Sequence, residues 1–141
     1  MKSKKRCATS SAKEQPEPIV FYVDECLGRG VGEALKQAGE EVRFYGEAVP
    51  RGARDTDWLA RIGEGGWVCL TKDKHIRRRL VERSALLAAR VKAFVLTSGN
   101  LTGAEMAEVF VRNLPKIRSL AARTKAPFIA KVTRSNVVEL Y

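Results

Sequence analysis

Short apolar runs alternate with amphipathic segments along most of this chain. Four runs have the length and the β-branched and aromatic content of buried strands, at about residues 19–24, 42–45, 67–70 and 91–97. After the first run, glycines turn the chain into a segment whose apolar residues recur at helical spacing, at Val31, Ala34, Leu35 and Ala38. The alternation predicts one α/β domain with a mainly parallel sheet and right-handed crossovers.

Two further helices and a pair of C-terminal strands complete the predicted elements. Asp55-Thr56-Asp57 precedes an apolar stretch that ends in glycines, which predicts a helix of about two turns capped by one of the aspartates. Thr102-Gly103-Ala104-Glu105 is a capping box that opens a long helix, and Pro115 is expected to kink or divide it. Residues 128–132 and 137–140 predict a terminal hairpin or a pair of short strands.

Acidic side chains follow the predicted strands at the points where ligands collect in α/β sheets. Asp24 and Glu25 end the first strand and Asp73 follows the third, while Asp55 and Asp57 begin a helix at the same edge. Carboxylates that converge there need a counter-charge, and magnesium accepts oxygen ligands while leaving places for phosphate. A phosphodiester is therefore the natural substrate. For Asp55 and Asp57 helix capping is an equal reading, and Glu25 is either a second ligand or solvent-facing.

The charge of the chain favours a polyanionic partner. Among its 141 residues, 26 Lys and Arg face 16 Asp and Glu, which gives a formal charge of +10. The charge is uneven, and the stretch from Lys74 to Arg90 is the most basic. A solvated basic face would have the same composition and is the alternative. The hypothesis is that basic side chains, together with Asn100, bind and guide RNA: Arg51, Arg54, Lys72, Arg77, Arg78 and Arg79.

The remaining composition excludes several classes of protein. Residues 1–18 are basic and nearly free of apolar side chains, which predicts a disordered tail before a domain of residues 19–141. Three widely spaced cysteines and a single histidine speak against a zinc site and fit a reducing cytoplasm. No apolar run is long enough for a membrane span, so no membrane partner is expected.

Three short acidic motifs carry a resemblance to a known family: Val23-Asp24-Glu25, Asp55-Thr56-Asp57-Trp58-Leu59-Ala60 and Leu70-Thr71-Lys72-Asp73-Lys74-His75-Ile76. Together with Thr97-Ser98-Gly99-Asn100-Leu101-Thr102-Gly103, they resemble compact PIN-like domains such as the VapC toxins of toxin–antitoxin pairs, over about residues 19–132. The resemblance implies a three-layer α/β/α sandwich and RNA cleavage that depends on Mg²⁺ or Mn²⁺. It also implies that Asp24, Asp55, Asp57 and Asp73 are the catalytic acids, with Asp24, Asp57 and Asp73 as metal ligands. A cognate antitoxin and a homodimer are partners that the sequence leaves open.

Two alternatives share the same elements. A phosphoacceptor receiver domain also places two acids after its first strand, an aspartate after its third and a Thr or Ser after its fourth, as Asp24-Glu25, Asp73 and Thr97-Ser98 do here. The basic run directly after Asp73 argues against it. The other alternative is a non-catalytic RNA-binding or regulatory module on the same fold.

Overall fold

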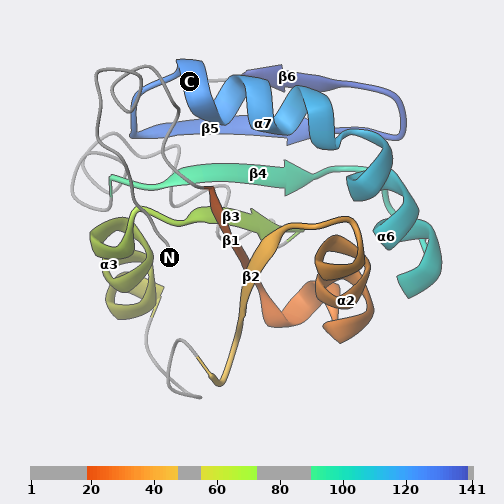
Figure 1. Ribbon diagram of the computed structural model, residues 1–141, viewed down its shortest axis with the longest axis horizontal. Helices are drawn as coiled ribbons and strands as arrows, with labels where there is room; N and C mark the ends of the chain where they lie inside the picture. Colours follow the sequence, from red (N-terminus) through yellow and green to blue (C-terminus); the bar gives the residue numbers. More distant parts are fainter. Residues whose placement is uncertain (1–18, 48–54, 73–89, 140–141) are drawn as a thin grey trace, which may run out of the picture.

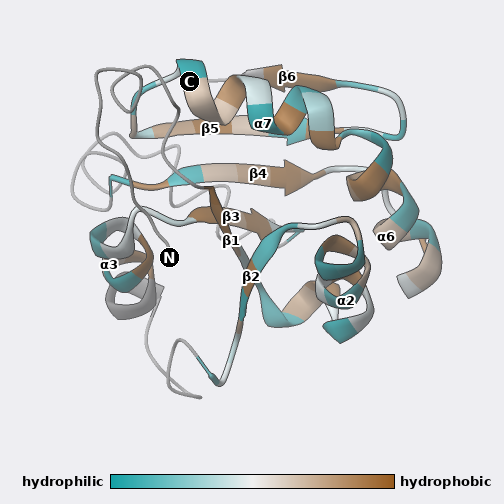
Figure 2. Ribbon diagram, viewed as in Figure 1, coloured by the Kyte–Doolittle hydropathy of each residue, from teal (hydrophilic) through white to brown (hydrophobic). Residues whose placement is uncertain are grey.

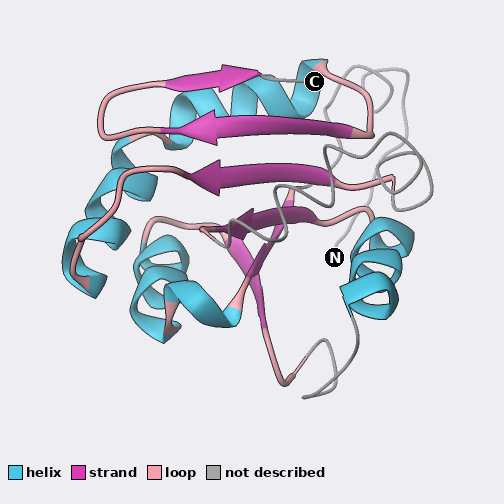
Figure 3. Ribbon diagram, turned by 180° about the vertical axis from the view of Figure 1, so that it is seen from behind, coloured by secondary structure: helices cyan, strands magenta, loops and turns pink. Residues whose placement is uncertain are grey.

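The computed structural model of the protein contains a six-stranded sheet in the order β2-β1-β3-β4-β5-β6 (Figure 1). It describes residues 19–47, 55–72 and 90–139, and for residues 55–58 and 139 the backbone alone. The strands are β1 (Val20–Val23), β2 (Glu41–Phe44), β3 (Val68–Thr71), β4 (Lys92–Leu96), β5 (Phe128–Val132) and β6 (Val137–Glu139). All neighbouring strands are parallel except β5 and β6, and Figure 3 shows the arrowhead of β6 opposed to those of β3, β4 and β5.

Helices cover both faces of the sheet and make the predicted α/β/α sandwich. One face packs against α2 (Arg29–Gln37), α6 (Gly103–Arg112) and α7 (Leu114–Arg123), whose apolar side chains form one buried cluster with alternate residues of the strands. The opposite face packs against α3 (Asp55–Gly65), which buries Leu59 and Ile62 on a second cluster. A short 3₁₀ helix, η1 (Glu25–Leu27), joins β1 to α2.

The strands read as continuous apolar runs because both faces of the sheet are buried. In β1, Phe21 and Val23 belong to one cluster and Tyr22 to the other, and all three are at most 2% exposed. Figure 2 shows the same pattern, with the hydrophobic colour along β3 and β4 and mixed colouring around α2 and α7.

Most of the predicted elements occur where the sequence places them. Thr102 and Glu105 form both hydrogen bonds of the capping box, at 2.8 and 3.1 Å, and the long helix is divided into α6 and α7 with Pro115 in the first turn of α7. The terminal hairpin is confirmed as the antiparallel pair of β5 and β6. The helix after the second strand is longer than predicted, since α3 has eleven residues, about three turns.

Two further predictions concern the N-terminal tail and membrane-spanning segments. The predicted disordered tail, residues 1–18, lies outside the described residues. No helix in the described part of the chain has both the length and the apolar character needed to cross a membrane.

Candidate functional site

Asp24 lies where β1 ends at the carboxyl edge of the parallel strands. Its backbone N–H donates to the Leu70 carbonyl at 3.0 Å and so continues the pairing of β1 with β3. Its backbone is extended, with φ −67° and ψ 151°, and it is the N-cap of η1. The chain therefore leaves the sheet directly at this residue, which holds its carboxylate at the edge that the sequence predicted.

Both oxygens of the Asp24 carboxylate accept hydrogen bonds from fixed donors. Oδ1 accepts from the backbone N–H of Glu25 at 2.8 Å, which is the capping bond of η1. Oδ2 accepts from Thr71 Oγ1 at 2.8 Å and from Cys26 Sγ at 3.3 Å. Two donors from η1 and one from the end of β3 therefore orient this half-buried carboxylate.

Thr71 is the last residue of β3 and is 0% exposed. Its hydroxyl reaches Asp24 across the strand boundary, and Cys26 Sγ lies 3.4 Å from the same hydroxyl. Thr71 lies in the motif Leu70–Ile76, but no role was predicted for it from the sequence. A hydroxyl that ends an otherwise apolar buried strand is the signal that identifies it, since such a group needs a partner.

Cys26 completes this small polar cluster. Burial raises the pKa of the Cys26 thiol to about 11, and the neighbouring Asp24 carboxylate adds to the shift. The thiol therefore stays protonated at neutral pH and donates to Asp24, while the backbone N–H of Lys72 approaches the sulfur at 3.5 Å. Sequence reasoning considered Cys26 only for metal-ligand spacing and redox compartment and missed this contact, because only the turn of η1 brings the thiol back toward Asp24.

The other predicted acids are placed only in part. Asp55 and Asp57 fall in the first turn of α3, and their side chains lie outside the described residues, as does the whole of Asp73. Within the described side chains, no three His, Cys, Asp or Glu residues gather in a group that would hold a metal ion. Of the four aspartates predicted to be catalytic, Asp24 is the one whose carboxylate the structure describes, and the exposed Glu25 carboxylate follows it directly.

The predicted RNA-contacting residues divide in the same way. Lys72 is exposed directly after β3, and Asn100 is exposed in the loop before α6 with a positive φ of 60°. The others lie outside the described residues: Arg51, Arg54, Arg77, Arg78 and Arg79. Thr97, which the receiver-domain alternative places after the fourth strand, directs its hydroxyl to the Val132 carbonyl at 3.5 Å, so the bond ties β4 to β5.

A pocket of about 210 Å³ opens beside Asp24, between β1, β2 and the start of α2. The lining side chains combine acids, one cation and two aromatic rings: Asp24, Glu25, Arg29, Phe44 and Tyr45. The Arg29 guanidinium lies over the Phe44 ring, with its central carbon 4.0 Å from the ring centroid. The carboxylate with the most fixed donors thus borders a small aromatic cavity.

Similarity to known proteins agrees with this geometry. A family model described as "PIN like domain" matches residues 19–98, more than half of the chain. The chain is also 32% identical over 125 residues to the protein named "Putative ribonuclease VapC45" of Mycobacterium tuberculosis (strain ATCC 25618 / H37Rv), across 85% of this chain and 90% of that protein. No solved structure is significantly similar to the chain. The chain belongs to the PIN-like domain family, as its motifs indicated, and its homology to VapC45 suggests a nuclease.

Proposed function

We propose that this protein is an endoribonuclease of the PIN-like class that hydrolyses RNA phosphodiesters with Mg²⁺ or Mn²⁺. The observation that carries the proposal is the Asp24 carboxylate, which Thr71, Cys26 and the Glu25 N–H hold at the carboxyl edge of the sheet. The similarity to VapC45, which is named as a putative ribonuclease, supports the same activity. The family match also argues against the receiver-type alternative.

Asp24, Asp57 and Asp73 would hold the cation, and Asp55 is the fourth acid that we assign to catalysis. The support for grouping Asp73 with Asp24 is that Asp73 follows Thr71 by two residues in the sequence, and Thr71 contacts Asp24. Aspartate oxygens are the hard donors that Mg²⁺ and Mn²⁺ accept. When bound, such an ion activates water and neutralises charge on a phosphodiester during in-line displacement.

The protein's own residues keep the Asp24 carboxylate in one orientation. Thr71 Oγ1 and Cys26 Sγ both bond to Oδ2, and the Glu25 N–H bonds to Oδ1, so rotation of the carboxylate would break three contacts together. Asp24 is therefore held in one orientation before any ligand arrives, and Thr71 and Cys26 act as positioning residues.

The basic side chains supply the attraction for RNA that the acids cannot. We assign this role to Arg51, Arg54, Lys72, Arg77, Arg78 and Arg79, with Asn100 at the end of the loop after β4. The support is the formal charge of +10 and the exposed position of Lys72 directly after β3.

We further propose that the protein is the toxin of a toxin–antitoxin pair, with a cognate antitoxin and a homodimeric state. The similarity to VapC45 across 90% of that protein supports this biological role. An operon partner that binds the pure protein and inhibits its RNA cleavage would meet the expectation, and a partner that binds without inhibition would not.

Cleavage of single-stranded RNA by the full-length protein tests the activity. Mg²⁺ or Mn²⁺ should support cleavage and a chelator should abolish it. Asp24→Asn should lower the rate by about 100-fold or more, since even outer partners of metal ligands are worth 10- to 100-fold. The matched control is Glu108→Gln, which removes the same charge from an exposed side chain on α6 and should cleave like the wild type. Equal rates for Asp24→Asn and the wild type would overturn the assignment, and RNA binding without any cleavage would favour a non-catalytic RNA-binding module.

A further inference from the structure

We propose that the pocket beside Asp24 is a subsite for one nucleobase of the RNA substrate, with a purine preferred. The inference rests on the proposed ribonuclease function and assigns a substrate contact to Arg29, Phe44 and Tyr45. Because Asp24 lines the same pocket, the base in it belongs to a nucleotide adjacent to the phosphate that is cleaved.

Arg29 and Phe44 form a stacking surface in the pocket. The Arg29 guanidinium carbon lies 4.0 Å from the centroid of the Phe44 ring, and the Arg29 side chain is 59% exposed. One side of the guanidinium is therefore covered by the ring, and the side away from the ring is accessible. RNA-binding proteins stack splayed bases on guanidinium planes and aromatic rings of this kind.

Packing and ion pairs hold the Arg29 and Phe44 side chains in place. Phe44 is 3% exposed, and its ring passes so close to α2 that a Cβ added at Gly32 would lie 2.2 Å from a ring atom. Arg29 is also tethered at its edges, at 3.5 Å to Glu47 and 3.8 Å to Glu33. A stacking surface that is fixed before binding loses little side-chain entropy when a base arrives.

The charge of the pocket also favours a base. Among the described residues that line it, Asp24 and Glu25 are carboxylates and Arg29 is the cation. This balance disfavours a phosphate group inside the pocket and suits a neutral ring. The exposed Lys72, which does not line the pocket, is placed to attract the backbone while the pocket takes the base.

The volume of the pocket matches one base. At about 210 Å³ it is smaller than the roughly 300–1,000 Å³ of sites for drug-sized ligands, so it admits one nucleobase and excludes a whole nucleotide. Half-buried Tyr45 forms part of the wall beside this space. A purine presents a larger face than a pyrimidine to the Arg29 plane, which is the reason for the preference.

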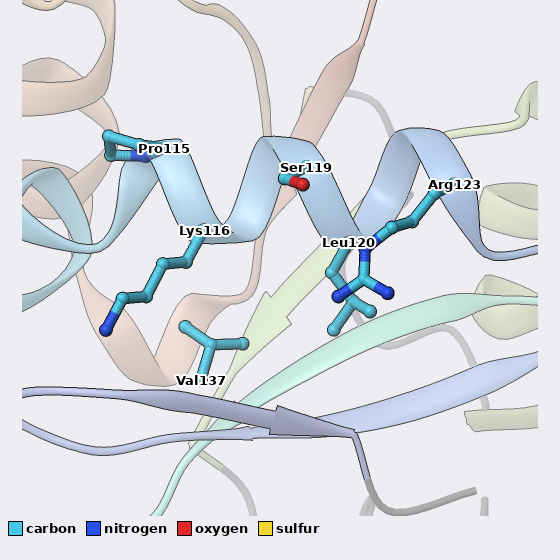
Figure 4. A pocket seen from close by; sticks show the side chains of 6 residues that line it. All are labelled: Pro115, Lys116, Ser119, Leu120, Arg123 and Val137. Atoms are coloured by element: carbon cyan, nitrogen blue, oxygen red, sulfur yellow. The ribbon is translucent and has the colours of Figure 1, made fainter.

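A second pocket provides a contrast and a control. It lies between α7 and β6 and is lined by Pro115, Lys116, Ser119, Leu120, Arg123 and Val137 (Figure 4). Among the described residues that line it there is no carboxylate and no aromatic ring, and Lys116 already donates to the Ser135 carbonyl and Asn136 Oδ1. Four strand spacings separate β1 from β6, roughly 19 Å, so Arg123 is a cation remote from Asp24.

The test uses short single-stranded RNAs that carry the fluorescent base 2-aminopurine at each position in turn, with abasic RNAs of the same length. The full-length protein is titrated in Ca²⁺ to suppress turnover. Arg29→Lys keeps the charge and removes the guanidinium plane, and Arg123→Lys is the matched remote control. We expect the wild type and Arg123→Lys to quench 2-aminopurine strongly at one position. Arg29→Lys should lose that quenching and bind the purine RNA about 5- to 150-fold more weakly, with little change for the abasic RNA.

The outcomes separate this inference from the proposed function. Equal weakening of purine and abasic RNA by Arg29→Lys, or quenching that Arg29→Lys leaves intact, overturns the base subsite, whether or not the protein cleaves RNA. Quenching that depends on Arg29 in a protein that cleaves no RNA with Mg²⁺ or Mn²⁺ supports the subsite and overturns the ribonuclease. Tyr45→Phe, which keeps the ring, should quench like the wild type, whereas quenching that Tyr45→Ala leaves unchanged would remove Tyr45 from the stacking wall.

Discussion

Thr71 donates a 2.8 Å hydrogen bond from Oγ1 to Oδ2 of Asp24, and so joins the carboxyl ends of two neighbouring parallel strands. The donor is 0% exposed and the acceptor is half-buried, so water cannot easily replace either partner. In the proposed ribonuclease this bond fixes the orientation of a metal ligand before metal or RNA binds.

Replacing Thr71 by Val should separate positioning from folding. Valine has nearly the shape of threonine but cannot donate, so Oδ2 of Asp24 would keep only the Cys26 thiol. We expect Mn²⁺ affinity and RNA cleavage to fall about 10- to 100-fold while the protein stays folded, and Thr71→Ser to recover most of both. Calorimetric titration with Mn²⁺ and a cleavage assay measure the two effects. A Thr71→Ser variant as weak as Thr71→Val would mean that the methyl group, and not the hydroxyl, matters.

Gly32 should be irreplaceable although it lies inside a helix. Gly→Ala in a helix usually stabilises by about 0.5–1 kcal/mol, but here the new Cβ would meet the buried Phe44 ring at 2.2 Å. Overpacking of this kind costs about 1–3 kcal/mol, so Gly32→Ala should lower the free energy of unfolding. Gly30→Ala is the matched control in the same helix, since nothing lies within 4 Å of its added Cβ. Urea unfolding of both variants decides the point, and equal stabilities would contradict the packing of Phe44 on α2.

Stability should fall as the solution becomes alkaline. Burial is the main cause that raises the pKa of Tyr22, Cys69 and Cys26, to about 11 for Cys26 against an ordinary value of 9.0. As the pH rises the unfolded state loses these protons first, so the contribution is present below about pH 9 and is lost as the pH climbs through the folded-state values. Cys26 alone should account for about 1 kcal/mol at pH 10. Urea melts at pH 8 and pH 10 measure the loss, which Cys26→Ala should reduce. A free energy of unfolding that rises between these pH values would contradict the burial of the three groups.

The salt dependence of RNA binding tests the arginines that follow Asp73. Each phosphate neutralised on a single strand adds about −0.7 to the slope of log affinity against log salt, so Arg77→Glu with Arg78→Glu should flatten the slope by about 1.4. Titrations in Ca²⁺ with single-stranded RNA at several salt concentrations give the slope. The control variant, Arg112→Glu with Arg123→Glu, makes the same charge change on α6 and α7 and should leave the salt slope unaltered. If the two double variants behave alike, the arginines after Asp73 belong to a general basic surface and are not an RNA path.

The sequence predicted the layers, the parallel sheet and the edge at which Asp24 lies, because burial of both sheet faces leaves a pattern that local reading detects. It underestimated α3, whose glycines Gly63 and Gly65 were read as its end. In the structure the helix continues through Gly63 to Gly65, because packing of residues such as Ile62 on the sheet outweighs local preference.

The hydrogen-bond partners of Asp24 could not be predicted from the sequence, for a different reason. The contact between Thr71 and Asp24 joins residues 47 positions apart, and only the pairing of β1 with β3 brings them together. The turn of η1 brings the Cys26 thiol into contact with Asp24, and residue spacing in the sequence does not predict this contact. The Arg29 and Phe44 pair likewise depends on how α2 lies against β2, which the close approach of Gly32 determines.

The most direct test of the central claim is whether Asp24 and Asp73 bind one and the same divalent cation. Mn²⁺ should be titrated into the wild type, Asp24→Asn, Asp73→Asn and the control Glu108→Gln, with thermal melts recorded with and without metal. We predict that Mn²⁺ binds the wild type and Glu108→Gln and raises their melting temperatures, as a ligand specific for the folded state must. Asp24→Asn and Asp73→Asn should each stay folded and lose that binding. Without metal, Asp73→Asn should melt at the same or a slightly higher temperature, because clustered carboxylates repel one another. Asp24→Asn should melt at a lower temperature, because an amide nitrogen cannot accept the hydrogen bonds that the carboxylate accepts. Undiminished Mn²⁺ binding by either aspartate variant would contradict the account.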